Sequence, residues 1–316
     1  GRGGLTPDVS LNYNSRRVDG ILTNDQSDWA GLGWTADTME IVRKVEPNFS
    51  NGQYANDGNV QWWNEFTLLY KGTAYKLKAG TGAAYGRYYC EDENFLYIER
   101  RNPYGGDSTA TNTTKEYWIV RSSDGTTYQL GKRSDSEQAI RTNYYDCELY
   151  NGCQWKHCND TPEPPTGEAC YAGHTINHIA FRWRVDQITD TSGNRIELFY
   201  DEEICPTEGG VPVYWREHAS YLREVRYNYT SSGDDSYRSK VVFVRAGRVD
   251  DGEYGCSAWF WFQEDYLSSI QAWNWNGSAL ELIREYKLEY VTERSPKAGG
   301  GFEGGVVRML TGITEY

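Results

Sequence analysis

Apolar and aromatic side chains occupy every second position in many short runs of this chain. A two-residue period places alternate side chains on opposite faces of an extended strand. The runs are "VSLNYNS" from Val9, "FTLLY" from Phe66, "AYKLKA" from Ala74, "NFLYIERR" from Asn94, "EYWIVRSS" from Glu116, "LREVRYNY" from Leu222, "KVVFVRA" from Lys240, "AWFWFQE" from Ala258 and "REYKLEYV" from Arg284. The pattern predicts an all-β protein.

Two pairs of strand-like runs are separated by turn sequences that favour hairpins. "SSDGTT", with Asp124-Gly125, joins "YWIV" to "YQLG", and "DTSGNR", with Gly193-Asn194, joins "RWRVDQI" to "IELFY". Glycine next to Asp or Asn adopts the left-handed backbone that tight hairpin turns need. We expect both pairs to form antiparallel hairpins.

Two segments interrupt the strand pattern. "SDSEQAIRTNYY" starts with the N-cap residue Ser134 and acidic neighbours, so we expect one or two helical turns there and little helix elsewhere. Residues 146–173 are rich in Cys, Pro and Gly, which indicates a loop inserted in a continuous fold. The predicted fold is a large antiparallel β-sandwich or β-shell-like assembly, a single β-rich domain over residues 1–316.

Composition and charge narrow the range of partners. Hydrophobic residues make up 38% of the chain but aromatic residues alone make up 15%, so large rings must form much of the core, and such rings also line sugar-binding surfaces. The net charge of −13, with no Lys/Arg cluster, argues against nucleic acid as a partner. No apolar run approaches the roughly 20 residues that span a bilayer, so we expect no membrane insertion. The start at Gly1 without a signal peptide suggests a mature or trimmed segment.

The cysteines and glycosylation sequons favour an oxidising, extracellular compartment. No Cys-x-x-Cys pair is present among the seven cysteines, so a zinc site fits poorly, and we expect neither metal nor cofactor. We expect disulfides to hold the inserted loop, whereas the pairing and the odd cysteine cannot be read from spacing. The loop cysteines are Cys147, Cys153, Cys158 and Cys170, and the predicted glycosylation sites are Asn48, Asn112, Asn159, Asn228 and Asn276.

The order of several motifs resembles that of a known family. "GGLTPDVSLNYNSRRVDG", "NDQSDWAGLGW", "YWIVRSSDGTTYQLG", "RWRVDQITDTSGNRIELFY", "YLREVRYNY", "REYKLEY" and "MLTGITEY" follow one another along nearly the whole chain. This succession is similar to the amino-terminal region of secreted Rhs/YD-repeat proteins, including the SpvB-like part of toxin-complex B components. The resemblance implies a β-rich module that starts or supports a large hollow β-shell around a cargo, and it carries over no catalytic residue. This chain departs from the family pattern at Asp28, where relatives have a small residue, and it lacks the tandem Tyr-Asp repeats.

The chemistry open to an acidic, aromatic, extracellular β-protein is mainly work on carbohydrates. Glycoside hydrolysis needs two carboxyl groups about 5–5.5 Å apart for retention or about 6.5–9.5 Å apart for inversion, one of them with a raised pKa. Burial against indole rings raises the pKa of a carboxyl group in this way. Carboxylates next to Trp or aromatic runs are therefore the candidate catalytic groups: Asp28, Glu65, Glu264 and Asp265. Each also has a structural interpretation, because Asp28 can cap a turn and the other three can solvate strands. The charged run from Asp201 to Glu203 is most simply a strand end.

Tryptophans offer a second, binding interpretation. Trp273 and Trp275 project from one face of a strand and can stack on pyranose rings, although core packing explains them as well. The substrate-binding candidates are Trp29, Trp34, Trp63, Trp273 and Trp275. Three functions compete. We favour a secreted polysaccharide hydrolase with a carboxylate pair in an aromatic-lined groove, and the alternatives are a non-catalytic Rhs-type scaffold, part of a larger polypeptide, and a glycan-binding module.

Overall fold

The computed structural model shows a chain folded almost entirely into β-strands. It describes residues 4–15, 18, 27–36, 38–47, 60–80, 86–92, 94–101, 116–145, 174–204, 214–230, 236–248, 263–294 and 306–316. Every strand pair in these segments is antiparallel. The all-β prediction and the antiparallel shell-like architecture are confirmed. No helix in this described part is long and apolar enough to cross a membrane.

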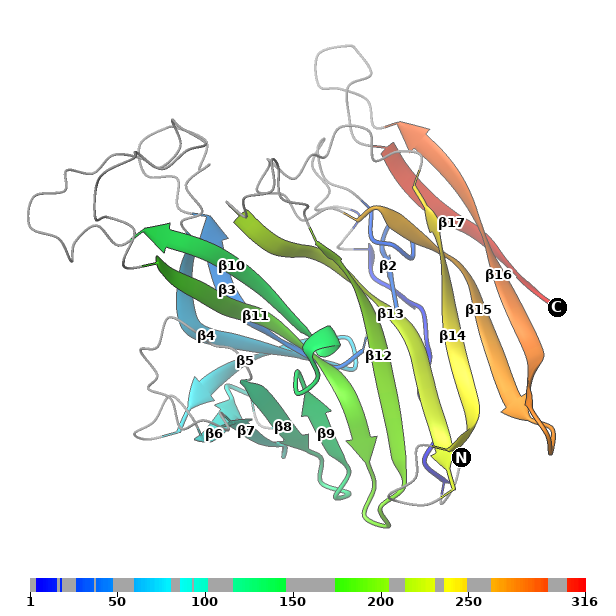
Figure 1. The fold of residues 1–316 in the computed structure, drawn as a ribbon, viewed down its shortest axis with the longest axis horizontal. Coiled ribbons are helices and arrows are strands. Elements are labelled where there is room, and N and C mark those ends of the chain that lie inside the picture. The colour runs from blue at the N-terminus through cyan, green and yellow to red at the C-terminus, as the bar shows by residue number, and fades with distance from the viewer. Residues whose placement is uncertain are drawn as a thin grey trace, which may run out of the picture.

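One group of strands closes into an eight-stranded barrel (Figure 1). Neighbours along the ring are hydrogen-bonded in order from β11 through β3 to β9, and β9 pairs back onto β11. The barrel strands are β3 (Glu40–Pro47), β4 (Val60–Tyr70), β5 (Thr73–Ala79), β6 (Gly86–Cys90), β7 (Tyr97–Arg101), β8 (Tyr117–Arg121), β9 (Thr127–Leu130) and β11 (His174–Thr189). Closure leaves these strands without an open edge.

The remaining strands form a long open sheet that extends from the barrel and curves away from it (Figure 1). Its order is β13, β14, β15, β16 and β17, and β17 is the last strand. The bounds are β10 (Glu137–Tyr145), β12 (Arg195–Ile204), β13 (Tyr214–Tyr229), β14 (Tyr237–Gly247), β15 (Asp265–Trp275), β16 (Leu280–Arg294) and β17 (Val306–Glu315). A separate small pair joins β1 (Asn12–Tyr13) to β2 (Trp34–Thr35).

Strands β10 and β12 connect the barrel to the open sheet. They lie end to end between β11 and β13. Residues 174–183 of β11 pair with β10, whereas residues 187–189 pair with β12. Strand β13 pairs with β10 over residues 214–216 and with β12 over residues 217–226. The sheet therefore branches at the gap between β10 and β12, and this gap positions the first candidate site.

Large rings fill the barrel, as the composition predicted. Phe66, Tyr88, Trp118 and Trp183 are buried, and their ring centroids lie 4.9 to 6.0 Å apart in mostly edge-to-face contacts. A barrel of eight strands is just wide enough for side chains to fill it. The interior is thus a packed core.

A buried ion triad lies beside these rings. The Glu116 carboxylate is fully buried and contacts Arg100 Nη2 at 2.7 Å and Arg43 Nη2 at 3.2 Å. The Arg43 guanidinium also lies 5.2 Å from the ring centroids of both Phe66 and Trp183. Each oxygen of this carboxylate thus faces a buried cation, so removing the acid would leave two buried positive charges uncompensated by it.

The helix expected after Ser134 is wrong. A short 3-10 turn covers Ser134–Ser136, and β10 begins at Glu137. The run from Ala139 to Tyr145 contains Ile, Thr and Tyr, which suit a pleated strand, and it pairs with β11. Both hairpins are confirmed, since β8 pairs with β9 and β11 with β12 across the predicted turns. The inserted loop and its cysteines Cys147, Cys153, Cys158 and Cys170 lie outside the described residues, so the disulfides stay a prediction.

Candidate functional site

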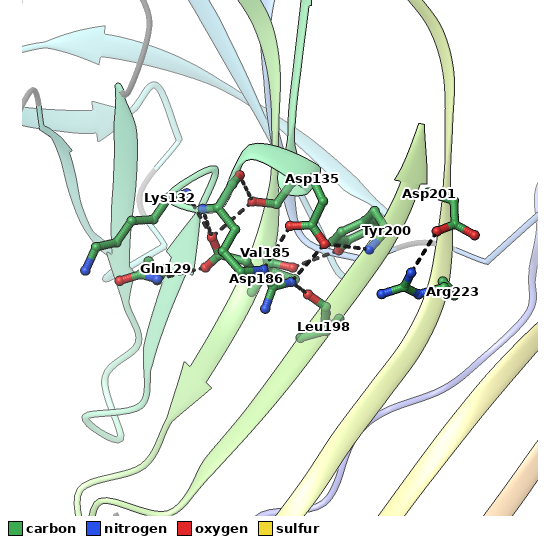
Figure 2. Close-up of polar contacts among 11 residues, drawn as sticks. Gln129, Lys132, Asp135, Val185, Asp186, Leu198, Tyr200, Asp201 and Arg223 are labelled. Carbon is green, nitrogen blue, oxygen red and sulfur yellow. Dashed lines mark hydrogen bonds and ion pairs between the residues drawn. The ribbon is translucent and has the colours of Figure 1, made fainter. Parts of the chain in front are cut away.

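Asp186 of β11 is the centre of a polar network at the branch of the sheet (Figure 2). Asp186 is buried, with 1% of its surface exposed. Its carboxylate accepts hydrogen bonds from Gln129 Nε2 at 2.9 Å, from the backbone N–H groups of Lys132 and Arg133 at 2.8 Å each, and from Ser136 Oγ at 3.0 Å. One carboxylate thus fixes the end of β9, the 3-10 turn and β11 together.

Asp135 forms the other half of this network, on the side of the open sheet. Its carboxylate accepts from Arg133 Nε at 2.8 Å and from the Tyr200 N–H of β12 at 3.0 Å. Arg133 also donates to the carbonyl oxygen of Leu198. The Tyr200 hydroxyl donates to the Val185 carbonyl at 2.7 Å, so the two ends of this residue join β12 to the 3-10 turn and to the barrel strand β11. The barrel-to-sheet junction, defined as Asp135, Asp186 and their partners, therefore sets how the open sheet leaves the barrel.

A second polar cluster, the Arg245 cluster, joins β12 to β15 farther along the open sheet. Arg245 of β14 contacts Asp265 at 2.6 Å, Asp201 at 2.8 Å and Glu203 at 3.8 Å. The Tyr221 hydroxyl donates to Glu203 Oε2 at 2.9 Å and accepts from the Asp265 N–H at 3.2 Å. The Arg245 guanidinium thus contacts carboxylates from β12 on one side and from β15 on the other.

Glu203 has the most perturbed carboxyl group of this cluster. Burial raises its pKa to about 7, and the neighbouring Glu264 and Asp265 charges act in the same direction. The hydrogen bonds from the Glu264 N–H, at 3.1 Å, and from Tyr221 oppose this rise. A carboxyl group of this kind exchanges a proton near neutral pH.

The opening stretch of tryptophans and glycines forms a tight turn at residues 27–34. The Gly31 N–H donates to the Asp28 carbonyl at 2.8 Å, and the Trp34 N–H donates to the Gly31 carbonyl at 3.0 Å. Gly31 has a φ of +105°, and a side chain there would come within 3.2 Å of the Leu310 nitrogen and of the Tyr290 ring. Glycine is thus required because the turn has a left-handed backbone and lies directly against β16 and β17.

Asp28 caps this turn, while the two tryptophans pack. The Asp28 carboxylate is half-buried and accepts from the N–H of Trp29 at 2.6 Å. Trp29 is 6% exposed, and its ring lies 5.3 Å from that of Tyr221. Trp34 lies 5.2 Å from the ring of Tyr13. Turn capping by Asp28 and packing of the two tryptophans thus account for these contacts.

The other catalytic candidates are spread over the molecule. Glu65 is exposed on β4 of the barrel, and Trp63 lies on the same strand but its side chain is outside the described residues. Glu264 is exposed just before β15, and Asp265 joins the Arg245 cluster. The structure therefore brings Asp265 near Glu203 and not near Glu65.

The tryptophan platform is half-buried and flanked by cations. Lys240 Nζ lies 5.5 Å from the ring of Trp273, and the Arg238 guanidinium lies 4.7 Å from that of Trp275. Both cations come from β14, so each indole has a cation over its ring. Stacking of these two rings on a sugar stays a prediction.

The glycosylation candidates differ in access. Asn276 is exposed in the hairpin between β15 and β16, where its Oδ1 accepts from the Ser278 and Ala279 N–H groups at 3.0 Å. Asn228 is half-buried and donates to Ser239 Oγ at 2.8 Å. Of the pair, Asn276 is the more accessible acceptor. Asn48, Asn112 and Asn159 lie outside the described residues.

The sequence does not single out Asp186, and it offers Glu203 only as part of a charged run that is most simply a strand end. Asp186 ends the "WRVD" motif from Trp183, which carried part of the family resemblance, and that motif was the available signal. Glu203 belongs to the run interpreted as a charged strand end, and nothing in the sequence places it next to Asp265. Among the described residues, no group of three or more His, Cys, Asp or Glu side chains is arranged to hold a metal ion.

Comparisons with known proteins give structural neighbours only. The sequence matches no family model, and no curated protein is significantly similar to it. The N-terminal domain of the effector protein SpvB from Salmonella typhimurium strain LT2 matches with a TM-score of 0.54 and 17% identity, over 99% of this chain and 94% of that chain. The chain has the fold of this domain. The resemblance predicted from the motifs is thus confirmed in the fold.

Toxin-complex structures match over the same extent. TcdB2-TccC3 and the Photorhabdus luminescens Tc holotoxin pore each align with a TM-score of 0.52 and 14% identity, over 99% of this chain. In both cases the aligned region is 14% of the other chain. This chain therefore spans about one seventh of the length of those toxin components.

Proposed function

We propose that this protein is a non-catalytic β-scaffold module that forms one segment of a larger Rhs- or toxin-complex-type assembly. The observation that carries the proposal is the sheet itself, which closes into a barrel at one end and, among the described strands, has β17 as its outermost strand at the other. The fold match to a 14% portion of much longer toxin-complex chains supports it. The neighbours' descriptions as an effector and as toxin components, with the sequons and cysteines, support secretion.

The outer edge of β17 can pair with a further strand. Glu285 and Tyr316 exchange both backbone hydrogen bonds, at 2.8 and 3.1 Å, so alternate residues of β17 face β16. By this alternation the N–H of Ile313 points to the outer edge. The Ile313 side chain is 51% exposed although it lies opposite the buried Leu288. An added strand would cover it and extend the sheet.

A hydrolase is supported less well. Glu203 and Asp265 are acids near each other, and Glu203 has a raised pKa, but Arg245 contacts both of them. A glycosidase needs the space between its two carboxyl groups for the sugar or the attacking water. One described pocket, of about 40 Å³, lies elsewhere, between residues 7–10 and the apolar face of β12–β14. Hydrolysis and glycan binding stay predictions.

The edge is tested by sedimentation of the 316-residue chain. We expect reversible self-association through β17, and we expect Ile313→Lys to reduce it at least about fivefold in association constant, because a charged side chain disfavours edge pairing. Val291→Lys is the matched control, since Val291 is 41% exposed on the interior strand β16. Equal loss in both variants, or a strictly monomeric wild-type chain, would contradict the edge as a docking strand.

A polysaccharide panel tests the competing function. We expect no release of reducing ends by the wild-type chain. Release that disappears in Asp265→Asn or Glu203→Gln would instead establish the hydrolase and overturn the scaffold proposal.

A further inference from the structure

The turn at residues 27–34 rests on the Arg245 cluster. The ring of Trp29 contacts that of Tyr221, whose hydroxyl is bonded to Glu203. The Trp29 carbonyl accepts from the N–H of Leu267, two residues after Asp265. The cluster thus supports both the ring and the backbone of the turn.

The same turn covers part of the outer edge of β17. The Leu32 N–H donates to the Arg308 carbonyl at 2.7 Å, and the Arg308 N–H donates to Ser27 Oγ at 3.2 Å. Arg248 of the β14 end holds Ser27 in place, with bonds of 2.9 Å to its carbonyl and 3.1 Å to its hydroxyl. The Arg248 N–H in turn donates to the Glu264 carbonyl at 2.7 Å. The turn, the start of β15 and β17 are therefore linked by one set of bonds.

The charges around Glu203 come from all the strands packed against it. Strand β12 contributes Asp201, β13 contributes Tyr221 and Arg223, β14 contributes Arg245, and Glu264 with Asp265 come from the start of β15. Arg223 pairs with Asp201 at 3.1 Å, and Arg245 is closest to Asp265 and Asp201. Of the three carboxylates that contact Arg245, Glu203 lies farthest from it, at 3.8 Å.

We propose that the Arg245 cluster is a proton-responsive clasp: with Glu203 protonated it holds the turn at residues 27–34 against β15 and β17, and ionisation of Glu203 loosens the turn. Ionised Glu203 repels the Glu264 and Asp265 carboxylates at the start of β15. The same segment contacts the turn, because the Glu264 carbonyl accepts from Arg248 and the Leu267 N–H donates to Trp29. Loosening the turn uncovers the edge of β17 at Arg308, where a further strand can then pair. The clasp goes beyond the scaffold proposal, because it regulates how much of the edge is open.

The direction of the pH effect follows from linkage. Burial raises the pKa of Glu203 from 4.5 to about 7 in the folded state. The clasp's contribution is fully present below the unfolded value of 4.5 and is lost as pH rises through 7. The turn at residues 27–34 is therefore most stable in acid, and the loss of its stabilisation by the clasp is complete in mild alkali.

Hydrogen exchange followed by mass spectrometry tests the clasp. After correction for intrinsic exchange rates, we expect peptides covering residues 27–34 and 306–310 to lose protection by about tenfold or more between pH 5 and pH 8. Barrel peptides over residues 60–79 serve as the internal reference. Glu203→Gln, which is neutral at every pH, should remove most of this dependence.

Glu197→Gln is the matched control, because Glu197 lies on the same strand and also accepts a hydrogen bond from a tyrosine, Tyr229. We expect it to follow the wild type. A flat wild-type profile, or a Glu203→Gln profile with the wild-type slope, would overturn the clasp. Should Glu203→Gln fail to fold, Asp265→Asn provides the second test: removing this neighbouring charge should move the midpoint to lower pH, and an unmoved midpoint counts against the proposal.

Discussion

Replacing Glu116 by glutamine is expected to lower the free energy of unfolding by about 3–5 kcal/mol. The Glu116 carboxylate is fully buried in the barrel and faces both Arg43 and Arg100. A neutral amide removes the negative charge that faces two buried guanidinium groups, and that is much costlier than losing an exposed ion pair. Urea denaturation followed by tryptophan fluorescence measures the change, since Trp118 and Trp183 lie in the same core.

Glu99→Gln is the control for this experiment. Glu99 pairs with Arg101 at 2.7 Å, but both side chains are partly exposed, at 22% and 44%. We expect a cost of at most about 1 kcal/mol there. Comparable costs in the two variants would mean that the triad in the barrel does not stabilise the core as described.

Asp186→Asn is expected to cost about 2–4 kcal/mol, because an amide cannot replace a carboxylate that accepts four hydrogen bonds. In either orientation the new NH₂ group faces a group that now donates, either the backbone of Lys132 and Arg133 or Gln129 Nε2. Loss of the hydrogen bonds to Asp186 should also loosen the junction between β9, β11 and the 3-10 turn. Urea denaturation gives the free energy, and hydrogen exchange at residues 129–136 locates the change.

Asp190→Asn in the next turn is the control. Asp190 Oδ1 accepts from the N–H groups of Ser192 and Asn194 at 2.9 and 2.8 Å in an exposed turn, and an asparagine oxygen can accept in the same way. Its cost should stay below about 1 kcal/mol. A small effect at Asp186 would show that the junction is held by strand pairing alone.

The strands and hairpins could be predicted because their signal is local. Alternation in "REYKLEYV" and the Asp124-Gly125 turn depend on residues a few positions apart, and the structure confirms them. The helix after Ser134 failed for the opposite reason. Its cap and acidic residues are local helix signals, but pairing of Glu137–Tyr145 with β11 outweighs them.

The barrel and the candidate sites depend on pairings far apart in sequence. Closure of the barrel requires β11 to pair with both β3 and β9, for example through Arg182 and Val185. The local sequence around these two residues does not indicate which strands they pair with. The aromatic surroundings of Asp28 suggested a reactive acid. The structure shows its carboxylate bonded to the next backbone N–H, and a catalytic role for Asp28 stays a prediction. The raised pKa of Glu203 arises from burial and from β15, so it could be found only in three dimensions.

The contact between Ser27 and Arg308 also determines when folding can finish. Their bond joins residues 281 positions apart, so the turn near the beginning of the chain cannot dock until the last strands have been synthesised. Strands β3 to β9 can collapse earlier, while the ribosome is still adding the rest. The ring of Trp29, however, has its partners Tyr221 and Phe243 earlier in the sequence than Arg308, so it can pack before the Ser27–Arg308 bond forms.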